Sequence, residues 1–155
     1  VDRGMIKILC VGKIKEKYLK EAITEYQKRI SKYTKLEIIE VEDIFEQSII
    51  DIKKKESELL QKYISSKDYV ITLELEGKQL DSIELSKKIS DTLIINSNIT
   101  FIIGGSYGLD DKIKQRSNCA ISFSKLTFPH QLFRVLLLEQ IYRSYKILNN
   151  ESYHK

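Results

Sequence analysis

The sequence predicts an α/β fold with a mainly parallel sheet and helices on both faces. Short apolar runs alternate with amphipathic segments from one end of the chain to the other, as in repeated strand and helix units. The length of 155 residues suits a single domain, and no apolar run approaches the ~20 residues of a membrane span. We therefore expect a globular cytoplasmic protein without a membrane-spanning segment.

Five runs rich in isoleucine, leucine and valine are predicted as strands, because strands buried in a parallel sheet are apolar on both sides. They are Ile6–Val11, Leu36–Val41, Tyr69–Leu75, Ile99–Ile103 and Ala120–Phe123. Gly12 is expected to end the first strand and Gly77 the third. The run at 99–103 is apolar except for Thr100, which predicts a central strand covered on both faces.

Five segments are predicted as helices from apolar residues spaced three and four apart. They are Tyr18–Tyr33, Ile49–Ile64, a third helix capped by Ser82, a short fourth helix capped by Asp110, and Gln131–Leu148. In an alternating α/β chain, ligands collect beyond the carboxyl ends of the strands. The loops that follow the strands are therefore the first places to look for a site.

The domain is expected to cover residues 5–155, with Met5 as its start and residues 1–4 as a remnant of cloning. Cys10 and Cys119 lie in separate apolar runs and match no metal or redox spacing. We interpret both cysteines as buried packing residues.

Charge is strongly segregated along the chain. Residues 13–35 carry a net charge of +5, residues 36–111 a net charge of −8, and residues 112–155 a net charge of +6. If the two basic segments meet in space, they would form a face suited to a polyanion such as nucleic acid. A merely solvated surface would explain the same pattern, and charge alone does not distinguish the two.

Three predicted loops follow strands at their carboxyl ends. They are Leu73–Lys78, Gly104–Leu109 and Phe123–His130. Glycines directly after a buried strand allow a ligand to approach the backbone, although a plain turn explains Gly108 equally well. The spacing G-G-x-x-G is not the dinucleotide fingerprint, and no phosphate-loop motif occurs in the chain.

Pro129 is the only proline of the chain. Proline fixes its own φ and disfavours helix in the residue before it, so the backbone must turn sharply before the last helix. A rigid loop of this kind suits a ligand. We interpret His130, on the turn that follows, as a residue that holds the loop rather than one that reacts.

Four motifs together resemble the RlmH family, small methyltransferases of the SPOUT superfamily that act on a pseudouridine of 23S ribosomal RNA. The motifs are Ile103–Leu109, Ser122–Val135, Glu139–Arg143 and Tyr153–Lys155, and they occur in this order. The resemblance covers the chain from Met5 to Lys155 and includes the opening Val11-Gly12-Lys13.

This resemblance implies a C-terminal trefoil knot whose loops bind S-adenosylmethionine in a bent form. It also implies methylation of pseudouridine N3 by a homodimer that acts on the assembled ribosome, with no metal. Carried onto this sequence, the implied cofactor site is Leu73, Gly104, Phe123, Ser124, Lys125, Leu126, Thr127 and Phe128.

Methyl transfer needs an aligned acceptor and a group that masks or removes the N3 proton. We expect His154 and Arg134 to act on the base, because a cation or hydrogen-bond donor stabilises the charge that develops there. The residues expected to bind RNA are Lys13, Lys15, Arg143, Tyr153 and Lys155.

The tail 153–155 would be a frayed terminus in an arbitrary protein. The resemblance implies instead that it folds over the cofactor. On the last helix, Glu139 and Arg143 are spaced to form a pair. The apolar residues of that helix are interpreted as core or dimer interface, namely Leu132, Val135, Leu136, Leu138 and Tyr142.

Two hypotheses from other classes stay open. A non-catalytic ribosome-binding factor would keep the basic face without needing the glycine loop or the proline loop. A nucleotide-dependent enzyme would explain the glycines but would bind ATP or NAD. Binding of S-adenosylmethionine separates both from the methyltransferase.

Overall fold

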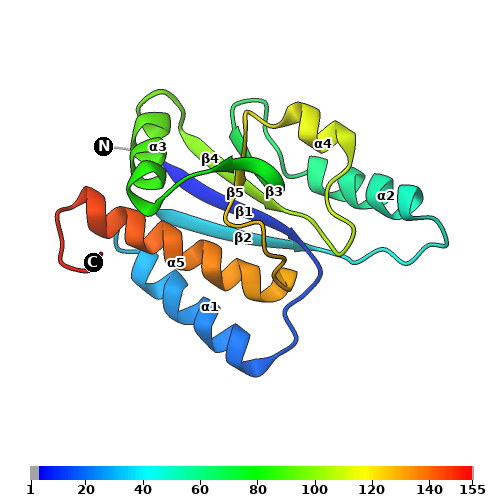
Figure 1. Ribbon diagram of the computed structural model, residues 1–155, viewed down its shortest axis with the longest axis horizontal. Coiled ribbons are helices and arrows are strands. Elements are labelled where there is room, and N and C mark those ends of the chain that lie inside the picture. Colours follow the sequence, from blue (N-terminus) through cyan, green and yellow to red (C-terminus); the bar gives the residue numbers. More distant parts are fainter. Residues whose placement is uncertain (1–3, 155) are drawn as a thin grey trace.

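The computed structural model describes residues 4–154 and has three layers, with helices on both faces of one sheet (Figure 1). The strands lie in the order β2-β1-β4-β3-β5, and each neighbouring pair is parallel. The predicted fold class is confirmed, and the sheet is entirely rather than mainly parallel. The strands are β1 Met5–Val11, β2 Lys35–Val41, β3 Tyr69–Gln79, β4 Asn98–Ile103 and β5 Cys119–Ser122.

Helices cover both faces of the sheet, and α5 packs against both α1 and α3. Figure 1 shows α2 and α4 together on the other side of the strands. Because α1 and α5 lie side by side, the two basic segments of the sequence do meet in space. The helices are α1 Lys17–Ile30, α2 Ile49–Gln61, α3 Ser82–Ile95, α4 Asp111–Arg116 and α5 His130–Leu148.

Alternation along β1 separates the two halves of the core. Ile6, Ile8 and Cys10 join the larger apolar cluster, to which α1, α3 and α5 contribute. Leu9 and Val11 point the other way and pack with residues of α2 and α4. Successive side chains of a strand point to opposite faces, so a strand covered on both sides is largely apolar. The exception in β1 is Lys7, whose buried ammonium pairs with Asp68 at 3.2 Å.

Cys10 is buried, as predicted, and burial raises the pKa of its thiol to about 11. Cys119 is only partly buried, because β5 lies at the edge of the sheet. A thiol with so high a pKa is a poor nucleophile at neutral pH, and Cys10 packs in the core and donates to the carbonyl of Ile39 at 3.5 Å. In the part of the chain that the structure describes, no helix is long and apolar enough to cross a membrane.

Local differences from the predicted elements lie at their ends. Asp81, and not Ser82, is the N-cap of α3, where it forms a capping box with Glu84. Asp110 occupies the N-cap position of α4 but makes no side-chain capping bond. β5 ends at Ser122, so Phe123 belongs to the loop. A box needs an acceptor three residues before Glu84, and only Asp81 has that spacing.

The third strand does not end at Gly77, because the chain continues as strand to Gln79. Leu73 and Lys78 both lie opposite Ile121 of β5, so the residues between them bulge out of the ladder. A Cβ atom on Gly77 would lie 2.7 Å from both the backbone N and the backbone C of Ile121. Only glycine allows the two backbones to cross this closely.

We predict that Gly77→Ala destabilises the fold, because the added methyl group would meet the backbone of Ile121 rather than a movable side chain. The expected loss is about 1–3 kcal/mol, as for other forced insertions into a packed site. Urea denaturation measures it. The neighbouring exposed residue supplies the control, since Lys78→Ala should leave the midpoint unchanged. An unaltered midpoint for Gly77→Ala would contradict the close crossing.

Candidate functional site

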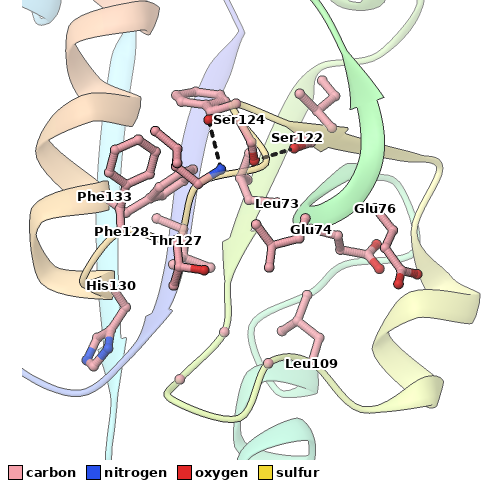
Figure 2. Close-up of a pocket in the computed structure, with 18 of the residues that line it drawn as sticks. Leu73, Glu74, Glu76, Leu109, Ser122, Ser124, Thr127, Phe128, His130 and Phe133 are labelled. Atoms are coloured by element: carbon pink, nitrogen blue, oxygen red, sulfur yellow. Dashed lines mark hydrogen bonds between the residues drawn. The ribbon is translucent and has the colours of Figure 1, made fainter.

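A cavity of about 450 Å³ lies at the carboxyl ends of β3, β4 and β5. These three strands are neighbours in the sheet, so the loops that follow them meet at one edge, as the sequence predicted. Figure 2 shows the loop after β5 on one side of the cavity and the bulge of β3 on the other. The glycine loop, which ends at Leu109, lines a third side of the cavity.

Seven of the eight residues expected to bind the cofactor line this cavity. They are Leu73, Gly104, Phe123, Ser124, Leu126, Thr127 and Phe128. Lys125 is not among the lining residues, and its side chain is exposed. The structure therefore gathers residues from three distant parts of the chain around one space, with the Lys125 side chain outside it.

The loop after β5 is held by its own hydrogen bonds. The Ser122 hydroxyl donates to the carbonyl of Ser124 at 3.0 Å, and the backbone N–H of Leu126 donates to the Ser124 hydroxyl at 3.0 Å (Figure 2). The ring of Phe123 packs on that of Phe133 of α5, with 4.9 Å between centroids. Side-chain bonds of this kind replace a ladder where strand pairing has ended.

Pro129 occupies the N-cap position of α5, where its carbonyl accepts the backbone N–H of Phe133 at 2.9 Å. Its φ of −55° suits the start of a helix. The bends between β5 and α5 lie at Phe123, Lys125 and Leu126, before the proline, and the helix begins at His130.

The glycine loop is tightly folded on itself. Gly108 has a φ of +84°, and its N–H donates to the carbonyl of Gly105 at 3.1 Å. A Cβ atom on Gly104 would lie 2.9 Å from the backbone carbon of Gly108 and 3.1 Å from the Leu109 side chain. The glycine at position 104 is therefore required by the turn itself, in addition to any role beside a ligand.

Sequence reasoning named the three loops but not several side chains that line the cavity. Those it missed include Glu74 and Glu76 of β3, Leu109, Lys114 of α4, and Phe133. The position of Glu74 and Glu76 at a strand's carboxyl end could have indicated them. Nothing in the sequence points to Lys114, which only the packing of α4 brings to the cavity.

Glu74 gives the otherwise apolar cavity an acidic wall. One carboxylate oxygen accepts a hydrogen bond from the Thr72 hydroxyl at 2.6 Å, and the other lies 3.8 Å from the Lys114 ammonium. Within residues 4–154, no group of three or more histidine, cysteine or acidic side chains could hold a metal ion. The polar wall therefore holds the carboxylates of Glu74 and Glu76 together with the ammonium of Lys114.

His130 lines the cavity from the first turn of α5 (Figure 2). Burial lowers the pKa of its imidazole, the positive charge of Arg134 lowers it further, and Asp43 opposes both. The ring is thus neutral at physiological pH. A neutral imidazole beside a cationic ligand avoids the repulsion that a charged one would cause.

Arg134 does not line the cavity. Its side chain is buried, and its Nη1 donates to Glu40 Oε2 at 2.7 Å. Nη2 donates to the carbonyls of Val11 and Gly12 at 2.6 and 2.7 Å. A guanidinium that is 2% exposed and bound to its own chain cannot reach a base, so this arrangement favours a structural role over the expected chemical one.

The C-terminal tail folds back against α5. The Tyr153 hydroxyl donates to Glu139 Oε1 at 2.8 Å, its ring meets Tyr142 edge-on, and the Arg143 guanidinium lies over it. The bond to Glu139, together with burial, raises the pKa of Tyr153 to about 12. The predicted pairing of Glu139 with Arg143 is confirmed, at 3.0 Å.

His154 lies outside the larger cavity. Its Nδ1 is 3.1 Å from Arg143 Nη1, and its side chain lines a neighbouring cavity of about 390 Å³. Ile121 and Phe123 line both cavities and so lie between them. Lys155 falls outside the described residues. Within one chain, the tail therefore reaches the far side of the loop that follows β5.

Lys13 and Lys15 lie on the loop between β1 and α1, and both are exposed. The backbone N–H of Lys15 donates to Gln131 Oε1 of α5 at 3.4 Å. The basic loop therefore rests on the same helical turn that carries His130. Its lysines are separated from Arg143 and Tyr153, which lie toward the other end of α5.

Glu56 of α2 is a buried carboxyl beside the glycine loop. It is 5% exposed, its Oε1 has no hydrogen-bond partner, and that oxygen lies 3.1 Å from the place of a Cβ on Gly105. Its Oε2 accepts the N–H of Ile44 at 3.4 Å. Burial raises the pKa of Glu56, so its negative charge opposes folding at neutral pH.

We predict that Glu56→Gln stabilises the protein at neutral pH by about 1 kcal/mol, the order expected for relief of a poorly satisfied buried group. A raised pKa in the folded state gives stability that is present in acid and is lost as the pH rises through it. The gain should therefore shrink as the pH falls toward 4. Thermal melts of both proteins across this range measure it, with exposed Glu58→Gln as control; a pH-independent difference would contradict the assignment.

Comparison with known proteins gives a family for this arrangement. A family model described as "Predicted SPOUT methyltransferase" matches residues 5–154. A protein of Clostridium tetani named ribosomal RNA large subunit methyltransferase H is 54% identical, over 97% of this chain and 99% of its own length. Proteins of the same name from Clostridium botulinum and Clostridium perfringens are 53% and 49% identical, with the same coverage.

The match includes every element that lines this cavity, from the end of β3 to the first turns of α5. The trefoil knot that the resemblance predicted for the C-terminal part of the chain is the fold that this family implies. The chain belongs to the SPOUT methyltransferase family, within the group that includes the ribosomal RNA large subunit methyltransferases H.

Proposed function

We propose that this chain transfers a methyl group from S-adenosylmethionine to N3 of a pseudouridine in 23S ribosomal RNA. The substrate is the assembled ribosome and the active form is a homodimer. The observation that carries the proposal is the cavity itself, which three loops enclose at the carboxyl ends of adjacent strands. The names of the relatives supply the class of RNA.

The cavity fits the cofactor in size and chemistry. Its volume lies within the range of about 300–1,000 Å³ that is typical of small-molecule sites. Leu73, Phe123 and Phe128 offer apolar surface for a heterocycle, and Glu74 offers a carboxylate to a cation. Since its side chain points elsewhere, Lys125 would contribute only backbone atoms.

The bound cofactor would supply a methyl group activated by a sulfonium. The protein then has to position N3 and help it lose its proton. Tyr153 stays protonated, because its pKa is about 12, so it can donate a hydrogen bond or stack but is not the base. We assign proton acceptance or orientation of the imide to His154.

A homodimer would bring the tail of one subunit to the cavity of the other, since His154 does not line the larger cavity of its own chain. The outward face of α5 supports such an interface. Leu132 is 38% exposed, and Val135 and Leu136 lie beside it at helical spacing and are partly exposed. Leu138 and Tyr142 are buried and belong to the core.

Contacts to the RNA backbone are assigned to Lys13 and Lys15, and contacts near the target base to Arg143, Tyr153 and Lys155. Phosphate contacts fix the register of a nucleic acid but carry no sequence information. A stacked tyrosine can hold an unpaired base in place. Lys15 contacts the first turn of α5 through Gln131, whereas Arg143 and Tyr153 lie toward the other end of that helix.

The test is methylation of ribosomes from cells that lack this protein, with labelled S-adenosylmethionine. We expect one methyl group per ribosome, located on a pseudouridine of 23S ribosomal RNA by mass spectrometry. Methylation of another nucleotide would change the proposed target. Ribosome binding without cofactor binding would instead favour the non-catalytic binding factor.

We predict that Leu126→Lys weakens S-adenosylmethionine binding about tenfold, because it removes apolar contact area and places a positive charge beside a cationic ligand. Leu126 lines the cavity but is 70% exposed, so its replacement should not unfold the chain. Calorimetry measures the affinity. Lys125→Ala is the matched control at the adjacent position and should bind normally. Equal affinity for both variants would remove the loop from the cofactor site.

We predict that His154→Ala lowers kcat for ribosome methylation about a hundredfold, the usual scale for a group that handles a proton. Cofactor affinity should stay unchanged, because His154 does not line the larger cavity. Tyr153→Phe separates stacking from hydrogen bonding and should retain most turnover if stacking is its role. Wild-type kcat in His154→Ala would exclude the imidazole from the chemistry.

A further inference from the structure

Arg134 is the largest side chain that is fully buried in the described part of the chain. Its guanidinium makes three hydrogen bonds of 2.6–2.7 Å, one to the Glu40 carboxylate and two to the carbonyls of Val11 and Gly12. Burying an arginine is costly unless its charge is paired and its donors are satisfied. Two of these bonds reach the end of β1, where the basic loop begins.

Glu40 extends the same contact to the loop. The oxygen that accepts from Arg134 also accepts the backbone N–H of Ile14 at 2.9 Å. Gly12 makes the turn between these points with a φ of +87°, and the Ile14 side chain is buried. Arg134 and Glu40 thus hold the backbone at Val11, where β1 ends, and at Gly12 and Ile14 of the loop. We call this pair the clamp.

The clamp shares a helical turn with the cavity wall. His130 and Phe133 of α5 line the cavity. Gln131 accepts the Lys15 N–H of the loop, and Arg134, three residues further along the helix, binds the carbonyls of Val11 and Gly12. The first turns of α5 therefore face the cavity on one side and the basic loop on the other. A shift of the loop relative to the cavity would require these bonds to break.

The loop backbone is held, but its cationic head groups are free to bind a ligand. Lys13 and Lys15 are exposed, and the side chain of Lys17 is 90% exposed with only Glu21 nearby, at 3.8 Å. Among the carboxylates near this loop, that of Asp43 lies against Gly12, that of Glu40 is bound to Ile14 and Arg134, and Glu16 is an exposed residue of the loop itself. A fixed backbone with free ammonium groups suits the phosphates of a structured RNA.

We propose that Arg134 is a positioning residue for RNA binding: with Glu40 it fixes the loop that carries Lys13 and Lys15 relative to the cofactor cavity. This inference rests on the proposed function. Phosphates bound to the lysines would then set where the target base lies. The energetic benefit is preorganisation, because a loop already in its bound form loses less entropy when RNA binds.

The experiment compares Arg134→Lys with wild type in steady-state methylation of undermethylated ribosomes. Lysine keeps the charge but cannot bind two carbonyls and a carboxylate in fork geometry. We expect KM for ribosomes to rise about tenfold, as on loss of one or two phosphate contacts. Both kcat at saturating ribosomes and the affinity for S-adenosylmethionine should be preserved.

Arg116→Lys is a matched control. Arg116 also ties two backbone carbonyls, those of Ser65 and Asp68, with bonds of 3.0 and 2.9 Å, but it lies at the opposite ends of the strands. It should lower stability without changing KM. A rise of KM in Arg116→Lys as large as in Arg134→Lys would show a general effect of loosening and would overturn the proposal.

A double-mutant cycle provides the readout that a merely structural arginine would not affect. If the clamp positions the lysines, then Lys13→Ala and Lys15→Ala should weaken ribosome binding less in the Arg134→Lys protein than in wild type. Additive effects would overturn the proposal, as would a fall in kcat at constant KM. If Arg134→Lys does not fold, Glu40→Gln and Glu40→Ala replace it in the same measurements. We then expect KM for ribosomes to be closer to wild type in the glutamine variant than in the alanine variant.

Wild-type methylation and ribosome binding are measured first, which separates the two proposals. If wild type does not methylate ribosomes, the proposed function fails. If wild type methylates ribosomes and Arg134→Lys keeps the wild-type KM, the proposed function stands and the positioning role fails.

Discussion

The close crossing of β3 over β5 is the constraint on which the site depends. Gly77 lies against the backbone of Ile121, so the bulge of β3 and the loop after β5 are held together where their strands end. Because β4 is the other neighbour of β3, its glycine loop joins them at the same edge. A cavity enclosed by three loops therefore follows from the backbone arrangement, before any side chain is considered.

Helix α5 connects the cavity at that crossing with the basic loop and the C-terminal tail. Its first turns provide the cavity wall through Phe133 and the clamp on the basic loop through Arg134. Its last turns hold the tail, where Glu139 and Arg143 bind Tyr153. One rigid element thus sets the cofactor cavity, the basic loop and the tail relative to one another, which is what a methyl transfer to a large RNA requires.

Two buried charged residues illustrate how differently such groups are satisfied. Arg134 binds a carboxylate and two carbonyls through its two terminal nitrogens, although its buried Nε has no partner, so its burial fixes structure. Glu56 has one N–H donor and a free oxygen, so its pKa is raised and its charge works against the fold. Both touch a segment that borders the site, the first the basic loop and the second the glycine loop.

The sequence by itself determined the α/β class, the order of strands and helices, and the three loops, because apolar periodicity and the positions of glycine and proline are local properties. The motifs also indicated most residues around the cavity. Only the tertiary structure decided that Gly77 lies within a crossing, that Lys125 lies outside the cavity, and that Arg134 is buried against Val11 and Gly12. The physical reason is that burial and hydrogen-bond partners depend on segments far apart in the sequence, 44 residues for Gly77 and Ile121 and 123 for Arg134 and Val11, which no spacing along the chain can reveal.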